Sequence, residues 1–310
     1  MRRRALLAGP LLLLLPWRAR AALLEQAEGF IDELVANDGF ERAYLEEVFG
    51  QLRLNPKVIE LIKPPAEGGR VVHWDEYRGR HVTYRKIRNG ASFAREHAEA
   101  LARAEAAYGV PAEIIVAIIG VETRYGGYTG NFGTAEALAT LAFGYPPRAE
   151  YFRKELRQLF IYARNAGFDV LELRGSYAGA MGVPQFMPTS ALEWAVDFDR
   201  SGQPDLFAPV DAIGSVANFL QFHGWVRDAP VAFPITPAAA ADPAALLAAG
   251  IIPTLPPAAF AAAGLPIDFG GGPVHAGPYA LVDLENEDEV VYRAGTMNYY
   301  ALTREIKERL

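Results

Sequence analysis

The run from Ile114 to Val121 is apolar at every position and is followed at once by a carboxylate, Glu122. A helix with so much apolar surface must be buried in a protein core. Ile115, Ile119 and Glu122 fall at positions i, i+4 and i+7, so we expect Glu122 on the apolar face. Burial disfavours the charged form of a carboxylate, which makes Glu122 a candidate general acid. A structural glutamate, bonded to the backbone or to a neighbouring arginine, is the alternative.

The amino terminus has the pattern of a secretory signal peptide. Residues 2–4 are arginines, residues 5–17 are apolar, and Ala19-Arg20-Ala21 fits a cleavage site. Residues 1–21 hold five of the 30 Lys and Arg residues and none of the 37 acids, so the mature net charge would be about −12. This acidity argues against nucleic acid as a partner. Both the Sec and the twin-arginine routes of export remain open.

The sequence also argues against thiol or disulfide chemistry, a zinc enzyme and a second membrane segment. The absence of cysteine excludes disulfides, thiol catalysis and an acylated amino-terminal cysteine. The five histidines show no i, i+4 pair with a glutamate between them, so a zinc enzyme is not expected. No later run approaches the ~18 uninterrupted apolar residues of a membrane span. We therefore expect an exported protein without a stable membrane anchor.

The spacing of apolar residues and the positions of Gly and Pro indicate a mostly helical chain without internal repeats. The expected helices cover residues 23–36, 41–49, 92–109, 111–122, 134–142, 149–166 and 211–223. Residues 71–88 show no clear period and read as a loop-rich cleft wall. After residue 229, Ala and Pro dominate, which indicates a lobe of short helices followed by antiparallel strands at 279–284, 289–293 and 297–302. The expected segments are 1–21 (signal peptide), 22–90 (helices and cleft wall), 91–228 (catalytic core) and 229–310 (small lobe).

A glycine-rich and proline-rich segment covers residues 175–190 and offers backbone that a ligand can approach closely. Ser176, Tyr177 and Gln185 supply polar groups within it. The spacing of glycine and serine is not that of a hydrolase nucleophile elbow, so we do not expect a nucleophilic serine. A plain packing turn is the alternative for this segment.

Residues 197–211 have the spacing of a calcium loop. Asp197, Asp199, Ser201 and Gln203 occupy loop positions 1, 3, 5 and 7, and Gly occupies position 6, as in an EF-hand. Position 12 is alanine instead of the bidentate glutamate, and Asp211 follows three residues later as a substitute for it. An N-cap for the next helix is the alternative role of Asp211.

Five motifs, in this order along the chain, together resemble the lytic murein transglycosylases of the B type. They are GVETRYG (120–126), TAEALATLAFGYP (134–146), GSYAGAMGVPQFMPTS (175–190), AVDFDRSGQPDLFAPVDAIGSVANFLQFHGW (195–225) and MNYYALTR (297–304). The resemblance implies an α+β, predominantly helical fold, with a lysozyme-like core and a small β-containing carboxyl-terminal lobe. It also implies a deep cleft for the glycan strands of peptidoglycan.

The same resemblance implies a reaction and residues that carry it. Members of this family cleave the bond between N-acetylmuramic acid and N-acetylglucosamine without water and leave a 1,6-anhydromuramoyl end. Glu122 matches their single catalytic acid and base, and Ser176 matches the serine near the acetamido group of the substrate. Tyr77, Gln185 and Asn298 match residues that hold the sugars. The loop ligands Asp197, Asp199, Ser201, Gln203 and Asp211 match the calcium site, whose ion would be structural, because the chemistry requires no cofactor.

Two rival functions and one departure from the family pattern qualify this interpretation. A hydrolytic muramidase would need a second carboxylate to position water, for which Asp75 and Glu76 are the candidates. A non-catalytic wall-binding protein is the other rival, although the glutamate on the apolar helix argues against it. Thr303-Arg304 is followed by Glu305-Ile306, where family members often have Tyr-Asn. We expect a free periplasmic protein whose partners are peptidoglycan strands and candidate wall-synthesis enzymes.

Overall fold

The computed structural model describes residues 15–64, 72–272 and 274–307, with the side chains of residues 15–22 and 305–307 left out. Helices dominate, and the described strands form only one two-stranded and one three-stranded sheet, which confirms the predominantly helical α+β class. The chain divides into two compact units, each made of two stretches of sequence. Unit 1 comprises residues 1–64 and 130–181, and unit 2 comprises residues 65–129 and 182–310.

Unit 1 is a bundle of helices around a cluster of aromatic side chains. Its elements are α1 (Leu15–Asp38), α2 (Arg42–Gln51), α3 (Pro56–Ile62), β1 (Phe132–Gly133), α8 (Thr134–Gly144), the short 3₁₀ helix η1 (Pro146–Arg148), α9 (Ala149–Ala166) and β2 (Arg174–Gly175). The rings of Phe49 and Phe160 stack with centroids 5.8 Å apart, and Phe30 meets Phe49 edge to face at 6.0 Å. These buried rings join α1, α2 and α9. Aromatic pairs of this kind stabilise a core by more than the burial of their apolar area alone.

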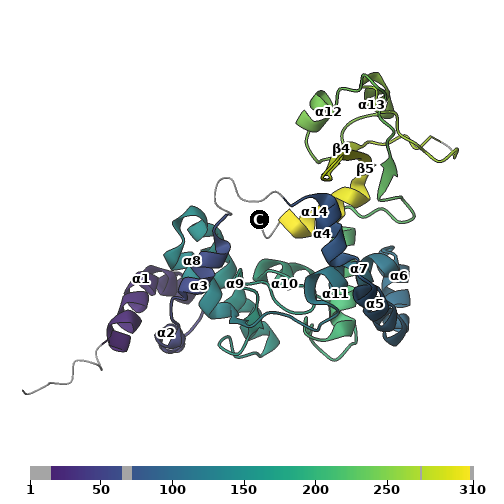
Figure 1. The fold of residues 1–310 in the computed structure, drawn as a ribbon. Coiled ribbons are helices and arrows are strands. Elements are labelled where there is room, and N and C mark those ends of the chain that lie inside the picture. Colours follow the sequence, from purple (N-terminus) through teal and green to yellow (C-terminus); the bar gives the residue numbers. More distant parts are fainter. Residues whose placement is uncertain (1–14, 65–71, 273, 308–310) are drawn as a thin grey trace, which may run out of the picture. The chain divides into compact units, whose positions relative to one another are not determined.

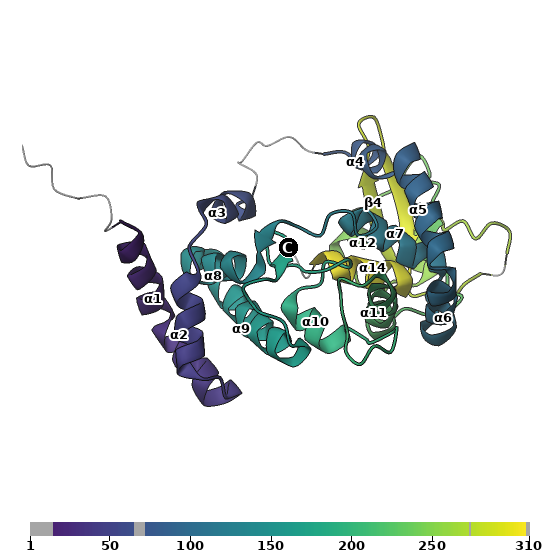
Figure 2. The same ribbon diagram turned by 90° about the horizontal axis from the view of Figure 1, so that it is seen from below.

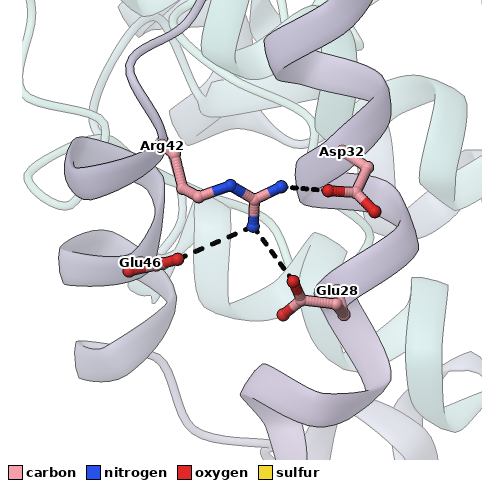
Figure 3. A network of polar contacts seen from close by, with 4 residues as sticks. All are labelled: Glu28, Asp32, Arg42 and Glu46. Carbon is pink, nitrogen blue, oxygen red and sulfur yellow. Dashed lines mark hydrogen bonds and ion pairs between the residues drawn. The ribbon is translucent and has the colours of Figure 1, made fainter.

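Charged contacts tie the same helices together at the surface. Arg42 on α2 reaches Glu28 at 3.0 Å, Asp32, and Glu46 at 3.6 Å (Figure 3). All four side chains are largely exposed, so this network adds little to stability. A more sheltered pair joins Asp38 to Arg157, whose guanidinium donates two hydrogen bonds of 2.8 Å to the carboxylate. Two parallel bonds in one pair fix the angle between the end of α1 and α9.

The helices of unit 2 position the candidate acid. They are α4 (Trp74–His81), α5 (Tyr84–Glu96), α6 (Ala98–Tyr108), α7 (Ala112–Thr123), α10 (Pro188–Trp194) and α11 (Pro209–Phe222). The central helix α7 packs against α5, α6 and α11, which cover its apolar surface (Figure 2). Trp225, which follows α11, donates from its indole nitrogen to the carbonyl of Gly109 at 2.9 Å and so ties α11 to the turn before α7.

The remainder of unit 2 is a small lobe around a three-stranded antiparallel sheet of order β3-β5-β4. Its elements are β3 (Ala232–Pro234), α12 (Ala244–Ala248), α13 (Pro257–Ala262), β4 (Ala280–Glu285), β5 (Val290–Gly295) and α14 (Met297–Lys307). Figure 1 shows α12 and α13 beside the sheet. Phe260, Leu265 and Tyr279, none of which is exposed, form the centre of its core. The expected ordered lobe of short helices is confirmed.

Two expectations about secondary structure were wrong. Residues 74–81 form helix α4 and residues 84–88 begin helix α5 (Tyr84–Glu96), where a loop was expected over residues 71–88. No residue of α4 is buried, so its sequence lacks the apolar stripe by which helices are recognised. Residues 297–307 form α14 instead of a third strand. Thr296 accepts a hydrogen bond of 3.1 Å from the backbone nitrogen of Asn298 and so starts that helix.

The described residues contain no single helix with the length and apolar composition needed to cross a bilayer. Helices α6 and α7 reach that composition only as a pair that bends by 114° between them. Residues 1–14 of the expected signal peptide lie outside the described residues, and residues 15–21 belong to α1. The expected boundaries at 90 and 228 remain predictions, because the compact units are discontinuous in sequence.

Candidate active site

Glu122 lies in the last turn of α7 and is half-buried. The fully buried face of the helix is formed instead by Ile115, Ile119 and Thr123, at positions i, i+4 and i+8. The carboxylate therefore stands at the edge of the apolar face, where the helix ends, and is only partly buried. A partly exposed carboxylate on a fixed helix can meet a substrate and still be sheltered from bulk water.

The backbone around Glu122 is fixed by its neighbours. The hydroxyl of Thr123 donates to the carbonyl of Val183 at 2.8 Å and accepts from the nitrogen of Gly126 at 3.0 Å. The next residue, Arg124, has φ 54° and ends the helix in the left-handed region. Because Thr123 is not exposed, these bonds hold the last turn of α7 against the loop that begins at residue 182.

Tyr125 locks the same turn to α5. Its hydroxyl donates to the carbonyl of Lys86 at 3.0 Å, and its ring passes between two glycines of α5 and α7. A Cβ atom at Gly90 or at Gly120 would lie 2.6 Å from the hydroxyl oxygen of Tyr125. Glycine is therefore required at both positions for this ring to sit between the helices.

Gln185 serves the loop next to α7. It is 7% exposed, has φ 56°, and its side-chain nitrogen donates to the carbonyls of Thr129 and Gly182, both at 2.9 Å. These bonds join the segment after α7 to the start of the loop at residue 182. Contact of Gln185 with a sugar remains a prediction.

Ser176 and Tyr177 lie in unit 1, in the turn after β2. The hydroxyl of Ser176 accepts from the backbone nitrogens of Ala178 at 3.3 Å and Ala180 at 3.1 Å, which closes the turn. The ring of Tyr177 meets Phe132 edge to face at 6.5 Å. Both side chains are half-buried, and their contact with substrate remains a prediction.

Tyr77 and Asn298, both in unit 2, have very different surroundings. The Tyr77 side chain is 41% exposed on α4 and stacks on the ring of His81 with centroids 4.5 Å apart. Asn298 is fully buried, and its amide bonds to the backbone of Val226 at 2.6 and 2.9 Å and of Ala229 at 2.8 Å. An amide satisfied in this way argues against the expected sugar contact and gives Asn298 a structural role.

Three carboxylates of the expected calcium loop come together in unit 2. Carboxylate oxygens of Asp197, Asp199 and Asp211 all lie within 4.8 Å of one another. Asp211 is fully buried and accepts from the backbone nitrogens of Phe198, Asp199 and Asp205 at 2.8–2.9 Å. It therefore binds the loop and does not act as the N-cap of α11, which is Ala208.

The electrostatics of this loop follow from burial and hydrogen bonding. Burial raises the pKa of Asp211, while the three backbone amides oppose that effect. Hydrogen bonds from Ser201 lower the pKa of Asp199. A set of carboxylate, hydroxyl and amide oxygens suits a hard cation such as Ca²⁺, so the residues present fit the expected ion.

His81 is a neighbour of Glu122 that was not expected from the sequence, and Lys86 is in turn a neighbour of His81. The Lys86 ammonium lies 3.2 Å from Nδ1 of His81. Burial and the charge of Lys86 lower the pKa of His81, and the carboxylate of Glu122 partly opposes them. Tyr77 and His81 are four residues apart, a spacing at which side chains meet on a helix. Their stacking would have been predictable had a helix been expected at residues 74–81.

Comparison with known proteins agrees with the resemblance read from the motifs. A family model for the transglycosylase SLT domain matches residues 23–304. The membrane-bound lytic murein transglycosylase B of Escherichia coli (strain K12) is 46% identical over 215 residues. That alignment covers 66% of this chain and 59% of the relative, so the chain matches about three-fifths of the relative's length.

Solved structures show the same fold. The Escherichia coli lytic transglycosylase SLT35, solved in complex with calcium, has a TM-score of 0.80 and 40% identity, covering 90% of this chain and 86% of that one. SltB3 from Pseudomonas aeruginosa, solved in complex with NAG-anhNAM-pentapeptide, has a TM-score of 0.76 and 26% identity, covering 94% and 75%. These similarities confirm the expected lysozyme-like fold class. The chain therefore belongs to the transglycosylase SLT domain family, among the lytic murein transglycosylases of the B type.

Proposed function

We propose that this protein is a peptidoglycan lytic transglycosylase that cleaves the β-1,4 bond between N-acetylmuramic acid and N-acetylglucosamine without water. The observation that carries the proposal is the placement of Glu122, a half-buried carboxylate at the end of an apolar helix whose last turn is fixed by Thr123 and Tyr125. Family membership supports the same reaction. SltB3 was solved with an anhydromuramoyl ligand, the kind of product that such a reaction leaves.

Glu122 would act twice in one turnover. As an acid it gives its proton to the glycosidic oxygen while the bond from that oxygen to C1 of the muramoyl residue breaks. As a base it takes the proton of the C6 hydroxyl while that oxygen bonds to C1. The proton count closes, and water is neither consumed nor released. An internal nucleophile explains why one carboxylate suffices where ordinary glycosidases use two.

Product analysis tests this proposal directly. Purified sacculi are digested with the mature protein, and the released muropeptides are weighed by mass spectrometry. We expect 1,6-anhydromuramoyl ends, which are lighter by one water than reducing ends. Reducing ends would establish a hydrolase instead, and a protein that binds sacculi without releasing fragments would be a wall-binding protein.

The hydrolytic rival is less well supported by the surroundings of its second carboxylate. Glu76 forms an ion pair with Arg80 one turn along α4, and Asp75 is exposed in the first turn of that helix. Glu76 would have to leave its partner before it could activate water. The transglycosylase needs no such step.

We also propose that the Asp197 loop binds a structural Ca²⁺ through Asp197, Asp199, Ser201, Gln203 and Asp211. SLT35 was solved with calcium, and the loop of this chain provides the oxygen ligands. An ion that binds only the folded state stabilises it by about 2.7 kcal/mol at a hundred times its dissociation constant. We therefore expect calcium to raise the melting temperature by about 5–10 °C over a chelator.

The matched variants for this test are Asp197→Asn, at a half-buried position, and Asp268→Asn, at an exposed one, both in loops of unit 2. The first should weaken the response to calcium, while the second should keep it, because Asp268 accepts from the nitrogen of Gly270 outside the loop. Melting curves that coincide with and without calcium would contradict the proposed site.

The proposed reaction implies where the protein works. Peptidoglycan strands lie in the periplasm, to which the expected signal peptide would direct the chain. Peptidoglycan is the proposed substrate, and enzymes of wall synthesis are the proposed protein partners. Fractionation of cells with a periplasmic marker checks the location.

A further inference from the structure

Three rings follow one another along α4. The indole of Trp74 stacks with the ring of Tyr77 at 6.0 Å and 24°, and Tyr77 stacks with the imidazole of His81 at 4.5 Å and 28°. Trp74 and Tyr77 are 37% and 41% exposed, whereas His81 is more sheltered. His81 is therefore the most sheltered of the three rings, and it supports the ring of Tyr77, which is proposed to hold a sugar.

Lys86 fixes the hydrogen-bonding state of this imidazole. Its ammonium lies 3.2 Å from Nδ1 of His81. An ammonium has only donors, so Nδ1 must be the acceptor, and the proton of the neutral ring is then on Nε2. A protonated His81 would present a second donor to Lys86 and lose this bond.

The charges around His81 favour its neutral form. Partial burial lowers the pKa of His81, and so do the charges of Lys86 and Arg80, while the carboxylate of Glu122 opposes them. Lys86 is itself partly sheltered, and its pKa is lowered by burial and by Arg124 and Arg85. The ring is thus neutral near pH 7, although it stands close to the candidate acid.

We propose that His81 is a positioning residue whose neutral imidazole, held by Lys86, fixes the Tyr77 ring and adds no positive charge beside Glu122. The proposal rests on the proposed transglycosylase function. Glu122 must start each turnover protonated, and a neighbouring imidazolium would favour its charged form and so oppose proton transfer. Protonation of His81 at low pH also breaks the Lys86 bond and releases the ring that supports Tyr77. The loss of activity on the acid side is then set by His81.

Nuclear magnetic resonance tests the cluster without any substrate. The full chain contains five histidines, so the imidazole signals can be assigned and titrated one by one. We expect Lys86→Met to raise the pKa of His81 by about half a pH unit or more, because a like charge is removed. We expect Glu122→Gln to lower it, because an opposite charge is removed. Arg85→Met is the matched control, since it removes an exposed charge next to Lys86 and should leave His81 unchanged.

Activity against sacculi supplies the second readout. His81→Phe keeps a ring beneath Tyr77 and removes the titrating group, so the acid limb of the pH profile should move to lower pH. Lys86→Met should move that limb to higher pH. An acid limb unchanged in both variants would overturn the proposal.

The two readouts separate the two proposals. If the protein fails to cleave sacculi but the pKa of His81 responds in opposite directions to Lys86→Met and Glu122→Gln, the proposed function fails and the cluster stands. If cleavage occurs but the pKa of His81 is the same in Lys86→Met and Glu122→Gln as in the wild type, the proposed role of His81 is refuted and the proposed function stands.

Discussion

Replacement of Glu122 by glutamine is expected to reduce the release of muropeptides from sacculi by about 10²–10⁴-fold, the usual contribution of a general acid and base. Glutamine has nearly the same shape but can neither give nor take the proton at the glycosidic oxygen. The melting temperature should change little, because the hydrogen bonds of Thr123 and Tyr125 fix the last turn of α7 in both proteins.

The matched control is Glu113→Gln on the same helix. Glu113 is exposed in the first turn of α7, so its loss removes one negative charge without touching the site. The Glu113→Gln protein should release muropeptides from sacculi at the same rate as the wild type. A Glu122→Gln protein that keeps its activity would show that another group delivers the proton.

Replacement of Gly130 by alanine is expected to destabilise the protein by more than about 3 kcal/mol. Gly130 has φ 102°, and a Cβ atom there would lie 2.0 Å from the carbonyl oxygen of Gly175. That neighbour is backbone at the end of β2, so it cannot move aside as a flexible side chain would. The contact also sets where the turn that carries Ser176 begins, so the release of muropeptides should fall with stability.

Gly250→Ala separates steric contact from backbone strain. Gly250 has φ 78° and no atom within 4 Å of its notional Cβ, so alanine there should cost only about 1 kcal/mol. Thermal melting and soluble yield compare the two variants. Equal losses at both positions would show that the close approach of Gly130 to Gly175 is not what requires glycine.

The helices that the sequence predicted are those with a buried apolar face. The range 149–166 matches α9 residue for residue, because Leu156, Leu159 and Phe160 form a buried stripe and Gly167 ends the helix in the left-handed region. Helix α4 was missed for the opposite reason, since its rings stack on one another and remain partly exposed. The spacing of apolar residues in a sequence indicates which face of a helix is buried, and no residue of α4 is fully buried.

Aromatic content misled the prediction for residues 297–302. Tyr299 and Tyr300 have a high strand propensity, yet the bond from Asn298 to Thr296 and the burial of Asn298 start a helix there. Tertiary contacts overrode local preference at this position. Asn298, for which the resemblance implies a sugar contact, is buried in this structure, and its amide bonds to the backbone of Val226 and Ala229.

The candidate site was predictable only in part. Glu122 stands out because a lone carboxylate ends an apolar run, and the calcium loop stands out because its oxygen ligands alternate. The contact of His81 with Lys86 joins two helices across a short loop, and neither residue type signals it in the sequence. The spacing of side chains from different helices is set by packing, which periodicity does not describe.

Digestion of sacculi in water enriched in heavy oxygen tests the central claim most directly. A hydrolase places an oxygen from water on C1 of the muramoyl residue, whereas intramolecular attack by the C6 hydroxyl places none. We predict anhydromuramoyl products without label from the wild type, and none from Glu122→Gln. Labelled reducing ends from the wild type would contradict the account.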